Sequence, residues 1–315
     1  MNSLPWFTVA GGINTDIVLR TSADPRHDGT SRITGWTQSL GGHAANAAVA
    51  LARLGSAVRL VGAVGTDADG DAAVASLARE GVDLTAVQRV PHAATGRAVV
   101  VNGPRMHHMM LECGANDAIG EVPPGAGPLL VFDPPHRVLR SAIAAAAGRL
   151  VVANPGGGIA DALPLILMAD RRVVLVCNET EFGDIGGPAR VAELREQLAA
   201  LVVTKGAAGC WIADGGGTVT VPAVPAKETD TTAAGDTFTA ALAVGLGAGG
   251  SLLDAARLAA AAAAVVVENV GGAVSLPGRA ALLGALSRRA HPAARDLLGG
   301  KAAATSDGQG EHSCV

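Results

Sequence analysis

The sequence predicts an α/β fold, a three-layer αβα sandwich in which helices cover both faces of a mostly parallel sheet. Short apolar runs with β-branched residues alternate with Ala- and Leu-rich segments of helical pattern. Such alternation is typical of parallel strands joined by right-handed crossovers. Hydrophobic residues make up 49% of the 315 residues, which is enough for a sizeable core. Two strand-like segments without a helical pattern predict a small β-sheet lid in addition.

The expected elements of the main sheet follow one another along the chain. The buried strands are predicted at residues 58–64, 129–132, 150–153, 173–177 and 201–204. The helices between them are predicted at residues 71–80, 141–147, 159–169 and 189–199. We expect one domain over residues 1–300 and a disordered tail at 301–315, because the tail is small and polar.

The expected lid comes from two segments, about 13–39 and about 95–112. The first contains strand-like pieces and polar turns. The second has two strand-like runs around Asn102-Gly103, a strong signal for a tight hairpin. Together they are expected to form a small sheet that projects from the domain and excludes water from a site beneath it.

Composition excludes several classes of partner. The net charge is −4, the chain has no dense Lys/Arg stripe, and aromatic residues make up only 2%, so we expect no nucleic-acid binding. The longest strongly apolar run, 258–267, is about half of what a bilayer requires, so no membrane segment is expected. No signal peptide is evident and the four cysteines form no CxxC motif, which predicts a cytoplasmic protein with reduced thiols.

The most informative stretch runs from Asp230 through Thr-Thr-Ala-Ala-Gly to Asp236 and leads into a helical pattern. Amides at a helix start point outward without partners, at the positive end of the helix dipole, and therefore cradle anions. Ala233, Ala234 and Gly235 are small enough for a phosphate to approach. Asp236 would lie in the first turn, where the dipole favours an ionised carboxylate that can accept a proton. The alternative is an Asp that only caps the helix.

This stretch resembles the C-terminal signature of the PfkB/ribokinase family of carbohydrate kinases. The run Gly41-Gly42-His43-Ala44-Ala45-Asn46, followed by a helix and Leu54-Gly55, resembles the N-terminal signature of that family. Further matches occur in family order between about residues 9 and 285, at 14–16, 61–67, 81–83, 114–116, 178–181, 204–206 and 271–277. The resemblance implies a ribokinase-like fold and ATP-dependent phosphorylation of a sugar hydroxyl, first of all the primary hydroxyl of ribose or another pentose.

The resemblance also implies roles for residues on the sugar side. Asp236 would be the catalytic base, and the amides of Ala233, Ala234 and Gly235 would form the anion hole. The positions that match sugar-binding residues are Asn14, Asp16, Gly42, His43 and Asn46. Without the resemblance, Asn14 and Asp16 could equally be turn residues. Two points stay open: ribokinases typically carry Lys where this chain has His43, and Asp133, before Pro134-Pro135, is an uncertain match to an acidic sugar contact.

On the nucleotide side, Asn178 and Glu181 match an N-x-x-E element that organises Mg²⁺ and phosphates, partly through water. Thr204 and Gly206 match the loop beside ATP. The residues that match monovalent-cation loops, which implies K⁺ as an additional cofactor, are Asp230, Thr232, Asn269, Gly271 and Ser275.

Several alternatives remain at this stage. Within the family, the substrate could be a nucleoside, a ketohexose or a keto-deoxy sugar acid, and Trp36 is the lid residue that could stack on a base. A non-catalytic sugar-binding protein is the alternative from another class. A dinucleotide oxidoreductase is suggested by the G-x-G-x-x-G run at 245–250, but that run follows a helix and not a strand. The resemblance further implies a homodimer formed through the lid.

Overall fold

The computed structural model describes residues 6–25, 28–125, 127–146, 148–169, 173–271, 276–289 and 296–297. The expected tail at 301–315 and the candidate cation ligand Ser275 lie outside these residues. Within them, a nine-stranded main sheet has the order β13-β12-β11-β10-β9-β8-β1-β4-β5. The strands are β1 (Phe7–Gly11), β4 (Val58–Gly65), β5 (Asp83–Val90), β8 (Leu129–Phe132), β9 (Val151–Asn154), β10 (Val173–Asn178), β11 (Ala200–Thr204), β12 (Cys210–Asp214) and β13 (Gly217–Val221).

The main sheet is parallel from β5 to β11, which confirms the mostly parallel sheet expected from the sequence. At one edge, β12 and β13 continue it as an antiparallel hairpin. The sequence analysis did not predict this hairpin. Its outer strand β13 is largely exposed and alternates Thr with Val, so it lacks the continuous apolar run of the buried strands.

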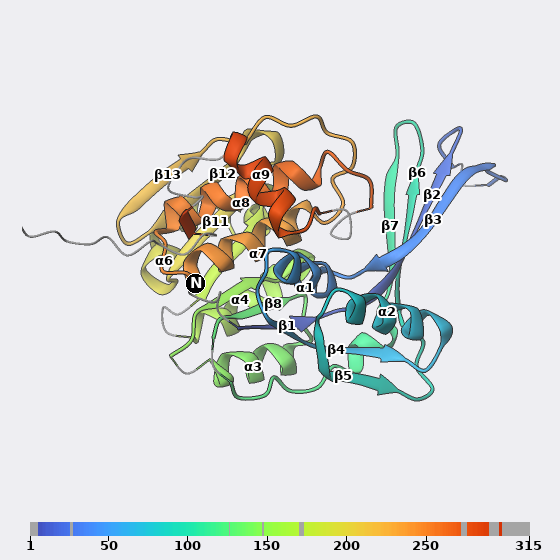
Figure 1. Cartoon of the computed structure of the whole chain (residues 1–315), viewed down its shortest axis with the longest axis horizontal. Helices are drawn as coiled ribbons and strands as arrows, with labels where there is room; N and C mark the ends of the chain where they lie inside the picture. Colours follow the sequence, from blue (N-terminus) through green and yellow to red (C-terminus); the bar gives the residue numbers. More distant parts are fainter. Residues whose placement is uncertain are drawn as a thin grey trace, which may run out of the picture.

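Helices cover both faces of the main sheet (Figure 1). One apolar cluster contains residues of α1 (His43–Arg53), α2 (Ala68–Arg79), α7 (Ala234–Gly247), α8 (Leu252–Val266) and α9 (Arg279–Arg289). The other contains residues of α3 (His136–Ala145), α4 (Ile159–Leu167) and α6 (Val191–Gln197). The short helix α5 (Glu179–Asp184) follows β10 directly. The three layers are therefore those predicted, with thin Ala side chains filling much of the space around α1, α7 and α8.

A second sheet, here called the small sheet, projects from the main sheet (Figure 1). Its four strands are β3 (Ile33–Gly41), β2 (Asn14–Thr21), β6 (Gly96–Asn102) and β7 (His107–Glu112), in that order. Two antiparallel hairpins, β2–β3 and β6–β7, are joined by parallel pairing of β2 with β6. The small sheet that the sequence predicts is thereby confirmed, and its strand β2 follows β1 of the main sheet after two residues.

The glycine run at 245–250 lies at the C-terminal end of α7. The amide of Gly250 donates a hydrogen bond of 3.0 Å to the Gly245 carbonyl, and Gly249 has a φ of 81°. This is a glycine turn that ends a helix, and it does not connect a strand to a helix. It therefore lacks the setting of a dinucleotide fingerprint. Among the described residues, no helix has both the length and the apolar character to cross a membrane.

Candidate active site

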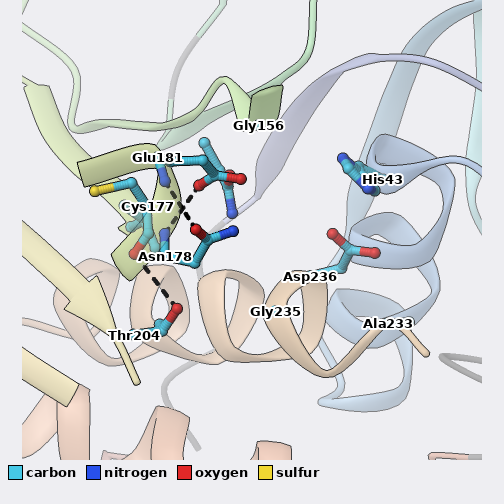
Figure 2. A pocket seen from close by; sticks show the side chains of 11 residues that line it. His43, Gly156, Cys177, Asn178, Glu181, Thr204, Ala233, Gly235 and Asp236 are labelled. Atoms are coloured by element: carbon cyan, nitrogen blue, oxygen red, sulfur yellow. Dashed lines mark hydrogen bonds between the residues drawn. The ribbon is translucent and has the colours of Figure 1, made fainter. Parts of the chain in front are cut away.

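A cavity of about 210 Å³ lies where the carboxyl ends of β9, β10 and β11 meet the beginnings of α1 and α7. The residues that line it include His43, Asn154, Asn178, Glu181, Thr204 and Asp236. His43 and Asp236 lie at one end of it, and Asn178, Glu181 and Thr204 at the other (Figure 2). In open α/β sheets ligands bind outside the carboxyl ends of the strands, which is where this cavity is.

The start of α7 presents two small residues to the cavity, the N-cap Ala233 and Gly235 in the first turn. Ala233, the N-cap, has a left-handed φ of 61°, and both Ala233 and Gly235 line the cavity. A side chain added at Gly235 would meet no atom within 4 Å, so the space over this residue is open. Ala234 differs from the prediction, because its amide donates 3.1 Å to the Thr231 carbonyl in a turn. The candidate anion cradle thus consists of the Ala233 and Gly235 amides.

Asp236 is buried in the first turn of α7, with 6% of its surface exposed. Its Oδ2 accepts a 2.9 Å hydrogen bond from Asn46 Nδ2 of α1, so the side chain is directed toward another helix. Burial raises the pKa of Asp236, while the charge of His43 and the Asn46 hydrogen bond lower it. The dipole argument from sequence was therefore incomplete, because desolvation is the largest influence on this carboxyl.

Among the expected sugar-binding residues, Asn14 is held in place by a residue that the sequence analysis matched to the family without giving it a role. Asn116 Nδ2 donates 2.7 Å to Asn14 Oδ1, and Asn116 Oδ1 accepts 3.0 Å from the Ile13 amide. The second contact fixes the orientation of the Asn116 amide. Asn116 therefore leaves the Asn14 amide nitrogen as the group of that side chain available to a ligand.

Asp16 is packed against Gly41 of the N-terminal signature, and the next residue, Gly42, is packed against the backbone of Gly12. A side chain at Gly41 would come within 2.1 Å of the Asp16 carboxyl, and Gly42 has a φ of 88° with the Gly12 carbonyl 2.5 Å from its hypothetical Cβ. Burial raises the pKa of Asp16 to about 6. Its Oδ1 is buried and has no hydrogen-bond partner among the described residues. A buried oxygen without a partner can accept a hydrogen bond from a hydroxyl of a ligand.

His43 forms an ion pair with Asp133, through Nδ1 and Oδ2. The charge of Asp236 is the largest cause that raises the pKa of His43, to about 10, and Asp133 and Asp16 raise it further. Half of the His43 side chain, 50%, remains accessible. The position at which ribokinases typically carry Lys is therefore occupied here by a histidine whose neighbouring carboxylates favour the charged imidazole.

At the other end of the cavity, where nucleotide contacts are expected from sequence, Asn178 and Glu181 form a capping box at the start of α5. Asn178 Oδ1 accepts 2.9 Å from the Glu181 amide, and Glu181 Oε2 accepts 2.9 Å from the Asn178 amide. Burial raises the pKa of Glu181. Thr204 also lines the cavity and donates 3.3 Å to the Cys177 carbonyl. Gly206, in contrast, does not contribute to the lining of this cavity.

The candidate monovalent-cation loops meet at Asp230. Its Oδ1 accepts 2.9 Å from the Thr232 amide and its Oδ2 accepts 3.1 Å from the Gly271 amide. Asn269 Nδ2 donates 2.9 Å to the Val265 carbonyl and so completes the end of α8. The structure thus brings Asp230, Thr232 and Gly271 together.

Sequence reasoning assigned no site role to four residues that line the cavity, Asn154, Gly156, Val176 and Cys177, of which two contact other parts of the site. Asn154, at the carboxyl end of β9, donates 3.1 Å from Nδ2 to Thr239 Oγ1, which donates 2.8 Å to the Gly235 carbonyl. This chain of hydrogen bonds supports the first turn of α7. Gly156, the other residue, lies beside Asp133. The available signal was a polar residue directly after the buried strand at 151–153.

Comparison with known proteins identifies the family. The family model described as pfkB family carbohydrate kinase matches residues 7–119 and 141–279. The chain belongs to this family. Ribokinase from Bacillus subtilis is 30% identical over 284 residues, which cover 86% of this chain and 96% of that protein. The predicted family and enzyme class, a phosphotransferase that acts on carbohydrates, are thereby confirmed.

Solved structures agree with this assignment to the pfkB family. The structure of Arabidopsis thaliana ribokinase complexed with ribose and ATP is 29% identical with a TM-score of 0.80, and covers 90% of this chain and 98% of that one. Nucleoside kinase from Burkholderia thailandensis in complex with inosine is 22% identical with a TM-score of 0.79, covering 90% and 96%. The latter likeness shows the fold alone. The predicted ribokinase-like fold is confirmed.

Proposed function

We propose that this pfkB-family kinase transfers the γ-phosphoryl group of ATP to the primary hydroxyl of ribose or a related pentose. The observation that carries the proposal is the position of Asp236, a buried carboxylate beside the cavity. Ala233 and Gly235 line the same cavity, and Asn46 donates a hydrogen bond to the Asp236 carboxyl. The similarity to ribokinases over most of the chain favours ribose as the acceptor.

In this proposal Asp236 accepts the proton of the sugar hydroxyl as the hydroxyl oxygen forms its bond to the γ-phosphorus. The bond from that phosphorus to the bridging oxygen breaks, and ADP leaves with the electron pair. The Ala233 and Gly235 amides donate hydrogen bonds to the charge on the transferred group. A base in reach of the hydroxyl contributes about 10²–10⁴ in rate.

The charges on the sugar side favour a neutral acceptor. Asp16 and Asp133 lie within electrostatic reach of His43 and Asp236 on this side. Among the described residues that line the cavity, His43 is the side chain with a positive charge, and Asp133 already neutralises it. A sugar acid would place its carboxylate among like charges, so a keto-deoxy sugar acid is disfavoured.

Trp36, the candidate for stacking on a nucleoside base, is 61% exposed.

Asn178, Glu181, Thr204 and Gly206 are proposed to hold ATP and its Mg²⁺. Mg²⁺ keeps several waters and takes one or two carboxylates, so the Glu181 carboxyl at this end of the cavity fits such an ion. Mg²⁺ would neutralise charge on the phosphates. K⁺ is proposed for the loops of Asp230, Thr232, Asn269, Gly271 and Ser275, because such ions take hydroxyl, amide and carbonyl oxygens.

The small sheet is proposed to act as a lid and to pair with the small sheet of a second copy. Met109 and Leu111 are 49% and 67% exposed on it. In the strand register Leu111 lies opposite Ala98, which lies opposite Asp16, so this exposed apolar surface is on the same face as the sugar-side carboxylate. A second copy would bury that surface.

The proposal is tested by measuring ADP release with ATP, Mg²⁺ and K⁺ across pentoses, hexoses and nucleosides. We expect ribose or a related pentose to give the highest kcat/KM. Asp236→Asn should reduce kcat by at least about 10²-fold while ATP still binds, because only the proton acceptor is removed. An unchanged kcat in this variant would refute the role of Asp236, and a preference for a sugar acid would refute the proposed substrate.

A further inference from the structure

His43 occupies an unusual place for a cation. It is the first residue of α1, whose N-cap Gly42 provides no side-chain hydrogen bond and whose first turn contains no acidic residue. The positive end of a helix dipole disfavours a cation at this position. A positive charge on His43 therefore has to be stabilised by groups outside α1.

Asp133 is that stabilising group, and the backbone around it determines its position. It follows β8 with a φ of 37°, which is rare for a residue other than glycine and persists only where the surrounding structure enforces it. Its carboxyl lies against Gly156, where an added Cβ would be 2.2 Å from Asp133 Oδ1. The strained backbone and the missing side chain at 156 together allow Asp133 Oδ2 to reach His43 Nδ1.

We propose that Asp133 holds His43 as an imidazolium facing Asp236, and that this cation keeps Asp236 ionised and stabilises the charge that is transferred in the reaction. His43 is then a catalytic residue and Asp133 is a positioning residue that acts through it. The inference rests on the proposed function, because it concerns the same cavity. His43 and Asp236 lie side by side at one end of that cavity (Figure 2).

The chemistry of the pair sets what His43 can do. In an imidazolium both ring nitrogens are donors: Nδ1 is engaged by Asp133, and the remaining Nε2–H cannot accept the hydroxyl proton. The proton therefore goes to Asp236. A fixed cation acts here by electrostatics: it lies beside the base that gains the proton and near the charge of the phosphoryl group during its transfer.

The charged groups around His43 come from several elements. They are Asp16 on β2, Asp133 after β8, Glu181 on α5 and Asp236 on α7. All are carboxylates, so each favours the charged imidazole. Burial raises the pKa of Asp236 and His43 is the first cause that lowers it. Removal of the cation should therefore move the ionisation of Asp236 to higher pH.

The first test is the pH dependence of kcat/KM for ribose in His43→Gln. We expect a fall of at least about tenfold at pH 7 and an acid limb that moves to higher pH. His43→Lys should restore most of the activity, since it restores a cation. His92→Asn is the matched control, because His92 lies in an exposed turn with a φ of 65° that Asn tolerates. A His43→Gln enzyme with the wild-type profile would overturn the inference.

The second test separates Asp133 from His43. Asp133→Asn keeps the size of the side chain and removes its charge, so the imidazolium should lose its proton at lower pH. The alkaline limb of the pH profile of kcat/KM should therefore move to lower pH. Asp161→Asn, at an exposed site on α4, is the control. An alkaline limb that does not move would remove Asp133 from the inference.

An NMR titration of the His43 imidazole tests the pair without any turnover. His43→Gln assigns the resonance. We expect His43 to stay protonated well above the usual pKa of about 6.5 and to titrate at lower pH in Asp133→Asn. A wild-type His43 that titrates near 6.5 would overturn the inference. Because this readout needs no substrate, a protein that shows the shifted titration but phosphorylates no sugar would refute the proposed function and leave the ion pair established.

Discussion

At the scale of single residues, the buried carboxyl of Asp16, which is proposed to bind the sugar, lowers the stability of the folded protein when it is ionised. The carboxyl is largely buried, and one of its oxygens has no partner among the described residues. Its pKa rises from 3.8 to about 6 because burial disfavours the charged form. The folded state therefore binds this proton more tightly than the unfolded chain, and the free energy of unfolding falls as pH rises from 3.8 to about 6.

Asp16→Asn should consequently stabilise the protein while it weakens sugar binding. The amide cannot ionise, so the gain in free energy of unfolding should grow between pH 4 and pH 6 and reach at most about 3 kcal/mol above that. The KM for ribose should rise about tenfold or more, because one strong acceptor is lost. Thermal unfolding at pH 4 and pH 8 measures the first effect, with Asp161→Asn as control. A variant with a lower melting temperature at pH 8 would contradict this account.

Residue by residue, sequence reasoning reached those parts of the site that lie in contiguous motifs. Asp230 to Asp236 and Asn178 to Glu181 each depend on a local helix start, which a few neighbouring residues determine. The pairing of His43 with Asp133 and of Asn116 with Asn14 joins residues about a hundred positions apart. The hydrogen bond of the Ala234 amide within a turn was not predicted either. A small residue at a helix start indicates space, but it does not show where the amide of that residue points.

At the scale of elements, Asp69 of α2 attaches the small sheet to the main domain. Its Oδ1 accepts 2.9 Å from Gln38 Nε2 on β3, and its Oδ2 accepts 2.9 Å from Arg97 Nε on β6. One carboxylate thus contacts both hairpins of the small sheet. The Asp69 side chain is 18% exposed and the Arg97 side chain 34%, so the contact contributes to placement more than to stability.

Asp69→Ala should therefore loosen the small sheet. We expect the KM for the sugar to rise several-fold with a smaller change in kcat, and hydrogen exchange to increase in β3 and β6. Asp71→Ala on the same helix is the matched control, because Asp71 pairs with Arg89 and not with the small sheet. Equal effects of the two substitutions on KM would argue against a specific attachment at Asp69.

Several strands with complete burial on both faces were predictable from sequence, although the equally buried β1 was not. The central strands β8, β10 and β11 carry continuous apolar runs, and each was expected within a residue of its observed bounds. Sequence reasoning did not predict the edge hairpin of β12 and β13 or the short helix α5, because neither presents a long apolar pattern. Helix α2 begins three residues before its expected start, since Asp67 caps it through the Gly70 amide.

At the scale of the whole molecule, the proposed dimer predicts a change in mass in solution. Replacement of both Met109 and Leu111 by Asp should convert a dimer to a monomer, because charges would be buried at the contact. Sedimentation equilibrium over a range of concentrations measures the result. Met168→Asp is the control, since Met168 is 75% exposed at the end of α4. A wild-type chain that sediments as a monomer at every concentration would refute the dimer.

The central position of β1 governs how the chain assembles as it leaves the ribosome. Thr8 in β1 pairs with Arg59 in β4 on one side and with Leu129 in β8 on the other. Until translation has passed β8, one edge of β1 has no partner, and an unpaired apolar edge promotes aggregation. Such distant pairing also slows folding. We therefore expect nascent chains that stop before residue 129 to depend on chaperones, and longer ones that include β8 to be progressively released from them.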